Sequence, residues 1–264
     1  FMEWYGDMAK EHHLPSYITI SHPDVFFMQT RWQRTDGAEL FFLTNSNRFN
    51  SIEQQLFFDQ SVIKDKDAFV YVLDDADNFS SVKNAVPRKY LLTVENDGSY
   101  RLHFGPAESV LLVFEKKNEQ TTEAYSPLLP NENAADCSRN WDLELLSKFT
   151  ERKSYFIDTL IDIKEIPEGK HFCGTAIYRK KINISDTTNV ILNLGSVVGV
   201  SELFVNGDSV GTKWYGERIW DISPFVKKGE NNLEIRVTTT MGNYLKSLTD
   251  NKVAMYWVNR KGRE

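Results

Sequence analysis

Apolar and polar residues alternate through much of the second half of the chain, and this period of two is typical of half-buried β-strands. Asn206-Gly207 lies between two such segments, and this dipeptide favours a type I′ turn because both of its positions must adopt positive φ. Residues 195–240 therefore predict a tight hairpin and further strands of an antiparallel sheet. In the last of these strands Leu233, Ile235 and Val237 share one face, so one face should be buried and the other solvated.

Short apolar segments also follow one another through the first half of the chain, separated by turn-forming residues such as Asp36-Gly37. Seven strands are expected there, at residues 25–29, 40–44, 55–58, 69–73, 90–94, 100–104 and 110–114. Short strands at this regular spacing favour a β-sandwich.

The remaining segments set the domain boundaries that we expect. Residues 1–16 should form a short helix that stops near Pro15. Residues 17–117 should form the first sandwich, residues 118–134 a linker and residues 135–264 a second domain. Within that domain, residues 141–145 alternate as a strand, whereas residues 154–163 fit either a helix or a buried strand. The predicted fold class is all-β, with two β-sandwich domains.

Composition supports a β-rich core and excludes several partners. Of the 264 residues, 41% are hydrophobic and 13% are aromatic, and aromatic side chains favour the pleated surfaces of sheets. The net charge is −6, so neither nucleic acid nor a membrane surface is expected as a partner. No apolar run approaches the roughly 18 residues of a membrane-spanning helix. The start at Phe1 lacks the charged segment of a signal peptide and suggests that something precedes it.

An ordered series of short motifs surrounds the hairpin. It runs from Leu-x-Leu-Gly at 192–195 through Val-Asn-Gly at 205–207 and Val-Gly at 210–211 to Asp-Ile-Ser at 221–223 and Gly-Glu-Asn at 229–231. This series resembles the sugar-binding jelly-roll domain shared by glycoside hydrolase family 2 and the family 106 α-L-rhamnosidases. The resemblance implies that the second domain is a galactose-binding-like jelly roll in the C-terminal accessory region of such an enzyme.

The first domain carries a further part of the resemblance. The run Asp-Gly-Ala-Glu-Leu-Phe-Phe-Leu-Thr-Asn at 36–45 looks like the sandwich that follows the catalytic barrel in family 106 proteins, and residues 12–15 look like the junction with that barrel. The family usually has His-Arg-Arg near the first strand, whereas this chain has Arg-Trp-Gln-Arg at 31–34. Only Arg34 matches, so it is the one candidate sugar contact that we carry over from this domain.

The segment after the hairpin holds the other candidate binding residues. A sugar presents a face of C–H groups and a rim of hydroxyls, so its site needs an exposed aromatic surface beside fixed hydrogen-bonding groups. The candidates for carbohydrate binding are Trp214, Tyr215, Glu217, Arg218 and, later in the chain, Asn243. In the alternative interpretation, Trp214 packs over the end of the sandwich or against a catalytic barrel and contacts no sugar.

No residues identify a catalytic centre, a metal site or a cofactor. Glycoside hydrolysis needs two carboxylates that flank one bond, and no acidic pair stands out. The cluster at 74–78 offers oxygen ligands for a structural Ca²⁺ but lacks the spacing and the glycine of a calcium loop, so a solvated turn is the better interpretation. For Cys137 and Cys173 we favour free, buried thiols over a disulfide, because buried cysteines usually act as small hydrophobic residues.

The expected function follows from the resemblance together with the length. A catalytic barrel takes about 250 residues, and two sandwiches leave no room for one. The chain is therefore expected to be a non-catalytic portion of a glycoside hydrolase of the rhamnosidase type, with carbohydrate and the barrel of its own parent chain as partners, in the periplasm or outside the cell. The alternatives are a free-standing carbohydrate-binding or adhesion module without enzymatic activity, and a structural spacer.

Overall fold

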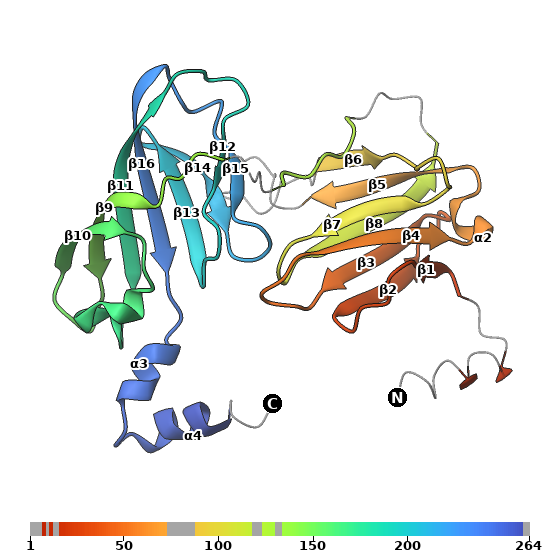
Figure 1. Cartoon of the computed structure of the whole chain (residues 1–264). Helices are drawn as coiled ribbons and strands as arrows, with labels where there is room; N and C mark the ends of the chain where they lie inside the picture. The colour runs from red at the N-terminus through yellow and green to blue at the C-terminus, as the bar shows by residue number, and fades with distance from the viewer. Residues whose placement is uncertain are drawn as a thin grey trace. The chain divides into compact units, whose positions relative to one another are not determined.

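The computed structural model describes residues 7–8, 11–12, 16–72, 88–117, 123–129 and 134–260. The chain forms two compact units, Phe1–Pro127 (unit 1) and Leu128–Glu264 (unit 2), and each is built from packed β-sheets (Figure 1). All neighbouring strands in these sheets run antiparallel. The predicted all-β sandwich class is therefore confirmed.

Unit 1 contains two sheets. The smaller has the order β1-β4-β7, formed by β1 (Ile18–Ile20), β4 (Ile52–Phe58) and β7 (Tyr100–Phe104). The larger has the order β2-β3-β8-β5-β6, formed by β2 (Phe27–Gln33), β3 (Glu39–Asn45), β8 (Ser109–Lys116), β5 (Lys66–Val72) and β6 (Arg88–Leu92). A single helical turn, α2 (Gln60–Ile63), follows β4.

Alternation along the strands places the core of unit 1 between these sheets. In β3, Phe41 and Leu43 are buried, whereas Phe42 between them points outward and is half exposed. Phe41 meets Phe58 of the other sheet edge to face at 4.9 Å between ring centroids, and Phe58 meets Phe114 at 4.7 Å. Each fully buried ring contributes roughly 1.5–3 kcal/mol through removal of its surface from water, so this cluster holds the two layers together.

Each of the seven strands expected in the first half overlaps an observed strand. β1 and α2 were not predicted. The helix expected over residues 1–16 lies largely outside the described residues, as does most of the linker expected over 118–134. Tyr125, in a described part of that linker, packs against the core of unit 1, and its N–H donates to the carbonyl oxygen of Leu91 at 2.8 Å.

Unit 2 is built on a larger sheet of order β10-β9-β11-β16-β13-β14. Its strands are β9 (Arg139–Leu146), β10 (Lys153–Thr159), β11 (Thr175–Ile184), β13 (Val200–Val205), β14 (Asp208–Lys213) and β16 (Gly229–Thr238). A two-stranded sheet of β12 (Ile191–Asn193) and β15 (Ile219–Asp221) forms the second layer. The core lies between them, where Trp220 from β15 joins Leu143, Leu203 and Ile235 from the larger sheet.

The predicted hairpin connects β13 and β14. Asn206 and Gly207 have φ of 53° and 93°, as a type I′ turn requires, so this prediction is confirmed. The Asn206 side chain also has a tertiary role, because its Nδ2 group donates to Oδ1 of the buried Asn231 at 2.9 Å. Asn231 in turn holds the turn before β16 through Lys227, so two amides tie the hairpin to that turn.

Other parts of unit 2 differ from expectation. Over residues 154–163, where a helix and a buried strand were both possible, the structure has a strand, β10. It is an edge strand in which Ile157 alone is buried, and a 3₁₀ turn, η2 (Ile163–Glu165), follows it. A second 3₁₀ turn is η3 (Pro167–Gly169). The helices α3 (Gly242–Ser247) and α4 (Lys252–Arg260) were not predicted.

The structure also bears on the two cysteines and on the possibility of a membrane-spanning helix. Cys137 and Cys173 are both free, as favoured, but they are half-buried rather than buried. Within the described residues, no helix combines the length and the apolar character that crossing a membrane requires.

Candidate functional site

The candidate loop, residues 214–218, connects the two layers of unit 2. It begins where β14 ends at Lys213 and finishes where β15 begins at Ile219. Strand register fixes its position, because Lys213 pairs with Ser201 and the preceding Val200 pairs with Thr238. The loop therefore starts at the end of the large sheet where β13 begins and β16 ends.

Two adjacent aromatic side chains form the accessible part of this loop. Trp214 is 67% exposed, and its ring meets that of the half-buried Tyr215 at 4.9 Å between centroids with an interplanar angle of 82°. Edge-to-face packing of this kind is favourable, so Tyr215 supports the Trp214 ring from one side. The arrangement leaves an aromatic surface open to solvent, as stacking on the C–H face of a sugar requires.

Arg218 holds the backbone of this loop in place. The residue is only 5% exposed, and its Nη1 group donates to the carbonyl oxygens of Tyr215 and, at 3.0 Å, Gly216. Its Nη2 group donates to the carbonyl oxygen of Gly199 at 3.3 Å, which joins the loop to the segment before β13. Both Nη groups thus bind protein, so Arg218 acts on the loop as a positioning residue.

Burial also sets the electrostatics of Arg218. Removal of the guanidinium from water lowers its pKa, and the negative charge of the adjacent Glu217 opposes that shift. Arginine stays protonated in proteins because its ordinary pKa exceeds 12. Arg218 therefore carries a positive charge behind the exposed aromatic pair, with the half-buried Glu217 beside it in sequence.

The other two candidate residues lie on different elements. Asn243 is on α3, and the described contact of its backbone oxygen is with Nδ1 of His171 at 3.4 Å. Arg34 lies in unit 1, where its guanidinium forms two bonds with Asp36, one of them from Nε at 3.2 Å. The Arg34 bond, then the Ala38 backbone N–H, lower the pKa of Asp36 to about 2. The structure thus gathers Trp214, Tyr215, Glu217 and Arg218 in one loop, and gives Asn243 and Arg34 other partners.

Sequence reasoning missed a row of charged residues on the outer face of the large sheet of unit 2, which we call the charged ladder. Glu144 on β9 accepts a bond from Arg179 on β11 at 2.9 Å, and Arg179 donates to Glu234 on β16 at 2.6 Å. Arg236 also donates to Glu234 and lies over the ring of Phe204, 4.3 Å from its centroid. The sequence does show charged residues at alternating positions of β11 and β16. Which of these charges pair with each other, however, depends on the strand register, which the sequence does not give.

A shallow depression of about 490 Å³ lies over this ladder. Glu234 beneath it pairs with both Arg179 and Arg236. Basic side chains outnumber acidic ones in its lining, which also includes Lys180, Lys181 and Asp142. In the part of the chain that the structure describes, no group of three or more His, Cys, Asp or Glu residues is arranged to hold a metal. The acidic cluster at 74–78 lies outside the described residues.

No protein-family model matches the chain. In class, the chain is an all-β sandwich region, and its resemblance to parts of glycoside hydrolases, expected from the sequence, is confirmed. The finding rests on one solved structure and one curated protein.

The solved structure is a rhamnosidase from Novosphingobium sp. PP1Y, which matches 91% of this chain with a TM-score of 0.64 and 21% identity, over 22% of its own chain. The curated protein, from Formosa agariphila, is named "Putative beta-glucuronidase" and is 35% identical over 129 residues, which are 46% of this chain and 11% of that protein. The chain therefore spans less than a quarter of either relative, and the solved structure shows a shared fold.

Proposed function

We propose that this chain is a non-catalytic C-terminal β-sandwich portion of a glycoside hydrolase that supports a catalytic barrel and helps to shape a carbohydrate site. In this proposal unit 2 is the galactose-binding-like jelly roll, and the parent enzyme hydrolyses a glycosidic bond of the rhamnosidic type. The parent acts in the periplasm or outside the cell, where polysaccharides are found.

The observation that carries the proposal is the match of 91% of this chain to a segment that makes up 22% of a rhamnosidase. A fold alone does not determine function, so the site must contribute as well. The loop 214–218 does so through an exposed Trp214 supported by Tyr215 and held by a buried Arg218. Such a preorganised aromatic surface limits the conformational entropy lost when a ligand binds.

The local roles of the buried acidic residues also agree with an accessory role. Hydrolysis of a glycoside needs one acid and one base or nucleophile with free access to the bond. Glu144, a buried carboxylate of unit 2, is instead bound by Arg179 on the sheet face, and Glu39 in unit 1 is bound by Arg31. These carboxylates stabilise the sheets.

Activity and binding assays on the 264-residue chain test the proposal. We expect no hydrolysis of p-nitrophenyl α-L-rhamnopyranoside or p-nitrophenyl β-D-glucuronide, and weak binding of the matching methyl glycosides that Trp214→Ala reduces. Cleavage of either chromogenic substrate by the purified chain would overturn the non-catalytic role. Equal binding by the wild type and Trp214→Ala would remove the loop from the site.

A free-standing carbohydrate-binding module is the second candidate, because the exposed aromatic loop would serve it equally well. The reading frame upstream of Phe1 separates the two. A barrel-sized segment there supports the enzyme portion, whereas a signal peptide directly before the sandwich supports the module.

A further inference from the structure

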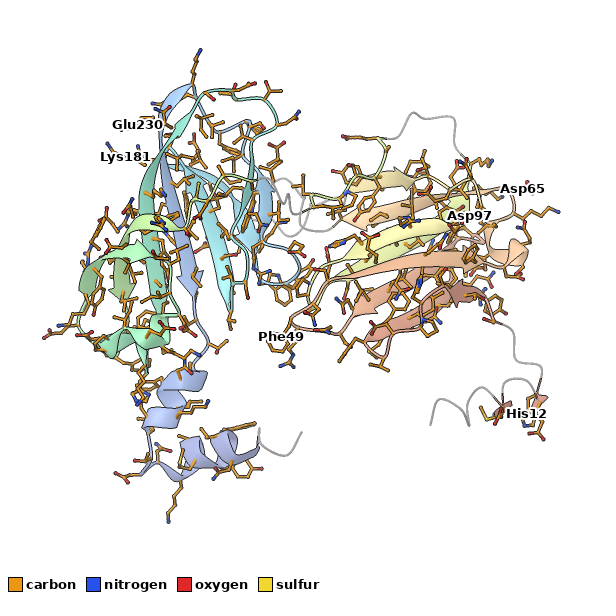
Figure 2. All side chains as sticks on the ribbon, in the orientation of Figure 1. His12, Phe49, Asp65, Asp97, Lys181 and Glu230 are labelled. Atoms are coloured by element: carbon orange, nitrogen blue, oxygen red, sulfur yellow. The ribbon has the colours of Figure 1, made fainter. Side chains whose placement is uncertain are left out.

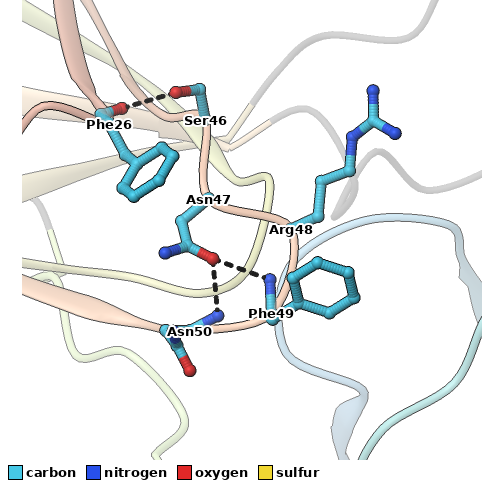
Figure 3. Close-up of a pocket in the computed structure, with 6 residues that line it drawn as sticks. All are labelled: Phe26, Ser46, Asn47, Arg48, Phe49 and Asn50. Atoms are coloured by element: carbon cyan, nitrogen blue, oxygen red, sulfur yellow. Dashed lines mark hydrogen bonds between the residues drawn. The ribbon is translucent and has the colours of Figure 1, made fainter. Parts of the chain in front are cut away.

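A second exposed aromatic feature lies in unit 1, at the loop between β3 and β4. Its side chains surround a hollow of about 450 Å³, the aromatic hollow, which is lined by Phe26, Ser46, Asn47, Arg48, Phe49 and Asn50 (Figure 3). This volume lies within the range of roughly 300–1,000 Å³ that is usual for small-molecule sites. The sequence analysis assigned no role to these residues.

The rings that line the hollow are unusually accessible. Phe49 is 84% exposed and Phe26 is 44% exposed, and Figure 2 shows Phe49 at the surface of unit 1. Burying a phenylalanine stabilises a protein by roughly 1.5–3 kcal/mol, so the fold gains little from a ring held in water. A site that later removes the ring from water would gain that energy on binding.

A network of neutral amides holds the loop rigid. The fully buried Asn45 donates from Nδ2 to the carbonyl oxygens of Asn50 at 2.8 Å and Gly105 at 2.9 Å, and its Oδ1 accepts the N–H of Asn47 at 2.9 Å. Oδ1 of Asn47 then accepts the N–H groups of Phe49 at 2.9 Å and Asn50 at 3.0 Å. The backbone that presents Phe49 is thus fixed at several points before any ligand arrives.

The turn before β2, on the other side of the hollow, is fixed to the same loop. Ser46 donates through both its N–H, at 2.8 Å, and its hydroxyl, at 2.9 Å, to the carbonyl oxygen of Phe26. The N–H of Phe26 donates in turn to Asp24 at 2.7 Å. Both aromatic residues therefore stand on one hydrogen-bonded frame, and their separation is set by the fold.

One polar group remains directed to the hollow. Figure 3 shows the Asn47 side chain between the two rings, with its oxygen toward the N–H groups of Phe49 and Asn50, and Arg48 directed away from both rings. The oxygen of Asn47 accepts hydrogen bonds within the loop, and among the described residues no group accepts a hydrogen bond from its Nδ2, which leaves this donor for a ligand. An apolar surface of two rings with an amide donor between them suits a molecule that has a C–H face and hydroxyl oxygens.

We propose that the aromatic hollow is a second carbohydrate-binding site that takes one uncharged pyranose residue. The C–H face of the sugar stacks on Phe49 and meets Phe26, and a ring hydroxyl oxygen accepts a hydrogen bond from Nδ2 of Asn47. This site lies in unit 1, whereas the proposed function places its contact loop in unit 2, so the two share a class of ligand but no residue.

Amide NMR of the whole chain, titrated with methyl α-L-rhamnopyranoside and in parallel with methyl β-D-glucuronide, tests the proposal. We expect saturable shifts of the Asn47, Phe49 and Asn50 amides at concentrations on the order of 1–10 mM of the uncharged glycoside, as is usual for a site this small. The charged glycoside should bind no better, because Arg48 points away from the rings.

Three variants make the test specific. Phe49→Ala should weaken binding at the hollow by about tenfold or more, the loss expected for one stacking ring. Phe42→Ala is the matched control, because Phe42 is a 51% exposed ring of the same unit outside the hollow. Asn47→Asp keeps the acceptor oxygen that holds the loop but removes the Nδ2 donor, so it should weaken binding several-fold while the unliganded spectrum of Phe49 and Asn50 stays close to that of the wild type.

Several results would overturn the inference. These are the absence of shifts at residues 47–50 with both glycosides, shifts that Phe49→Ala leaves unchanged, or an equal effect of Phe42→Ala. Trp214→Ala separates the two sites, because it should leave the shifts at residues 47–50 intact. Failure at the hollow with shifts retained at 214–218 would refute this inference alone, and the reverse pattern would refute the proposed loop alone.

Discussion

The loop 46–50 of unit 1 and the loop 214–218 of unit 2 each present a large aromatic side chain to solvent, but different chemistry holds them. Phe49 is 84% exposed and Trp214 is 67% exposed. Behind Phe49 lie Asn45 and Asn47, which are neutral and both donate and accept. Behind Trp214 lies Arg218, a buried cation whose two Nη groups donate to backbone carbonyl oxygens.

This difference teaches how an exposed ring is kept in a fixed position. Neutral amides hold a loop without a charge to desolvate, and two of them share the task. A guanidinium reaches several carbonyl groups at once, but burying its charge costs free energy that its hydrogen bonds must offset. Loop 46–50 should therefore keep its conformation when one of its hydrogen bonds is lost, whereas loop 214–218 depends on Arg218 alone among the residues that hold the two loops.

Among the residues that hold the two loops, replacement of Arg218 should lower the unfolding free energy most. Arg218→Met leaves the carbonyl groups of Gly199, Tyr215 and Gly216 without their donor, and we expect unit 2 to lose about 2–4 kcal/mol of unfolding free energy. Urea unfolding followed by tryptophan fluorescence measures this loss, because Trp141 and Trp220 are buried in unit 2.

Arg236→Met is the matched control for this prediction. Arg236 is a half-exposed arginine of the same unit that pairs with Glu234, and exposed ion pairs contribute about 0–1 kcal/mol. If the two variants destabilise unit 2 equally, the special role of the buried guanidinium is refuted.

Replacement of Asn45 should have the next largest effect, confined to unit 1. Asn45→Ala removes the donor for the carbonyl groups of Asn50 and Gly105 and the acceptor for the N–H of Asn47, at a cost of about 2 kcal/mol. Amide hydrogen exchange measures the loss, read in unit 1 for Asn45→Ala and in unit 2 for the comparison variant Asn193→Ala. Asn193→Ala, which removes an exposed side-chain bond to the Gly195 N–H, should cost about 0.5 kcal/mol, and a larger effect there than at Asn45 would contradict this comparison.

The strands of both units were predictable because local alternation determines which face is buried. The hairpin at Asn206-Gly207 was predictable for a similar reason, since positive φ at two adjacent positions is a local property of those residues. The aromatic loop 214–218 could likewise be found from residue types alone. Its exposure is observed here, but sugar binding by it stays a prediction.

What local patterns could not show are the partners of buried polar groups. Arg218 stands next to Glu217 in sequence, but the carbonyl oxygen of Gly199 to which it donates lies 19 residues away. Asn45 binds the carbonyl oxygen of Gly105 across 60 residues. Such contacts depend on strand register, so the positioning roles of these residues appear only in the fold.

The exposure of β10 and the two unpredicted helices have more local causes. The apolar run Tyr155-Phe156-Ile157 favours burial by its composition. However, β10 lies at a sheet edge, and Phe156 is exposed to solvent. The start of α4 carried a usable signal that was missed, since Oδ1 of Asn251 accepts the N–H groups of Val253 and Ala254 as a helix cap. α3 offers no such signal, because its first turn has no side-chain cap.

A smaller effect on stability should distinguish the charged ladder of unit 2 from the contacts of Arg218 with loop 214–218. Burial acts to raise the pKa of Glu234, but hydrogen bonds from Arg179 and Arg236 outweigh burial, and the pKa lies below its ordinary value of 4.5. A lowered folded pKa means that the ionised carboxylate adds stability above about pH 4.5, and that this stability is lost as the pH falls through the folded pKa. Arg218 stays protonated over the same range.

Glu234→Gln measures that contribution. At pH 7 the unfolding free energy of the variant should be lower than that of the wild type by about 1 kcal/mol or less, as expected for a partly exposed pair. This difference should disappear as the pH falls below 4.5, the ordinary pKa of the group. Urea unfolding of both proteins at pH 7 and in acid gives the two differences. A difference that stays constant between the two conditions would show that Glu234 stabilises the sheet by packing rather than by charge.

The smallest effects on stability are expected at the exposed rings themselves. Phe49→Ala and Trp214→Ala should each change the unfolding free energy by less than about 0.5 kcal/mol, because exposed side chains contribute little to packing. Trp220→Ala, at a buried ring of unit 2, should cost about 3–5 kcal/mol in the same unfolding assay. This contrast matters for interpretation, since a variant that loses sugar binding while keeping its stability has lost a contact and not a fold. A loss above about 1 kcal/mol for Phe49→Ala would mean that the ring packs against protein in solution, and the aromatic hollow could then not be open to a sugar.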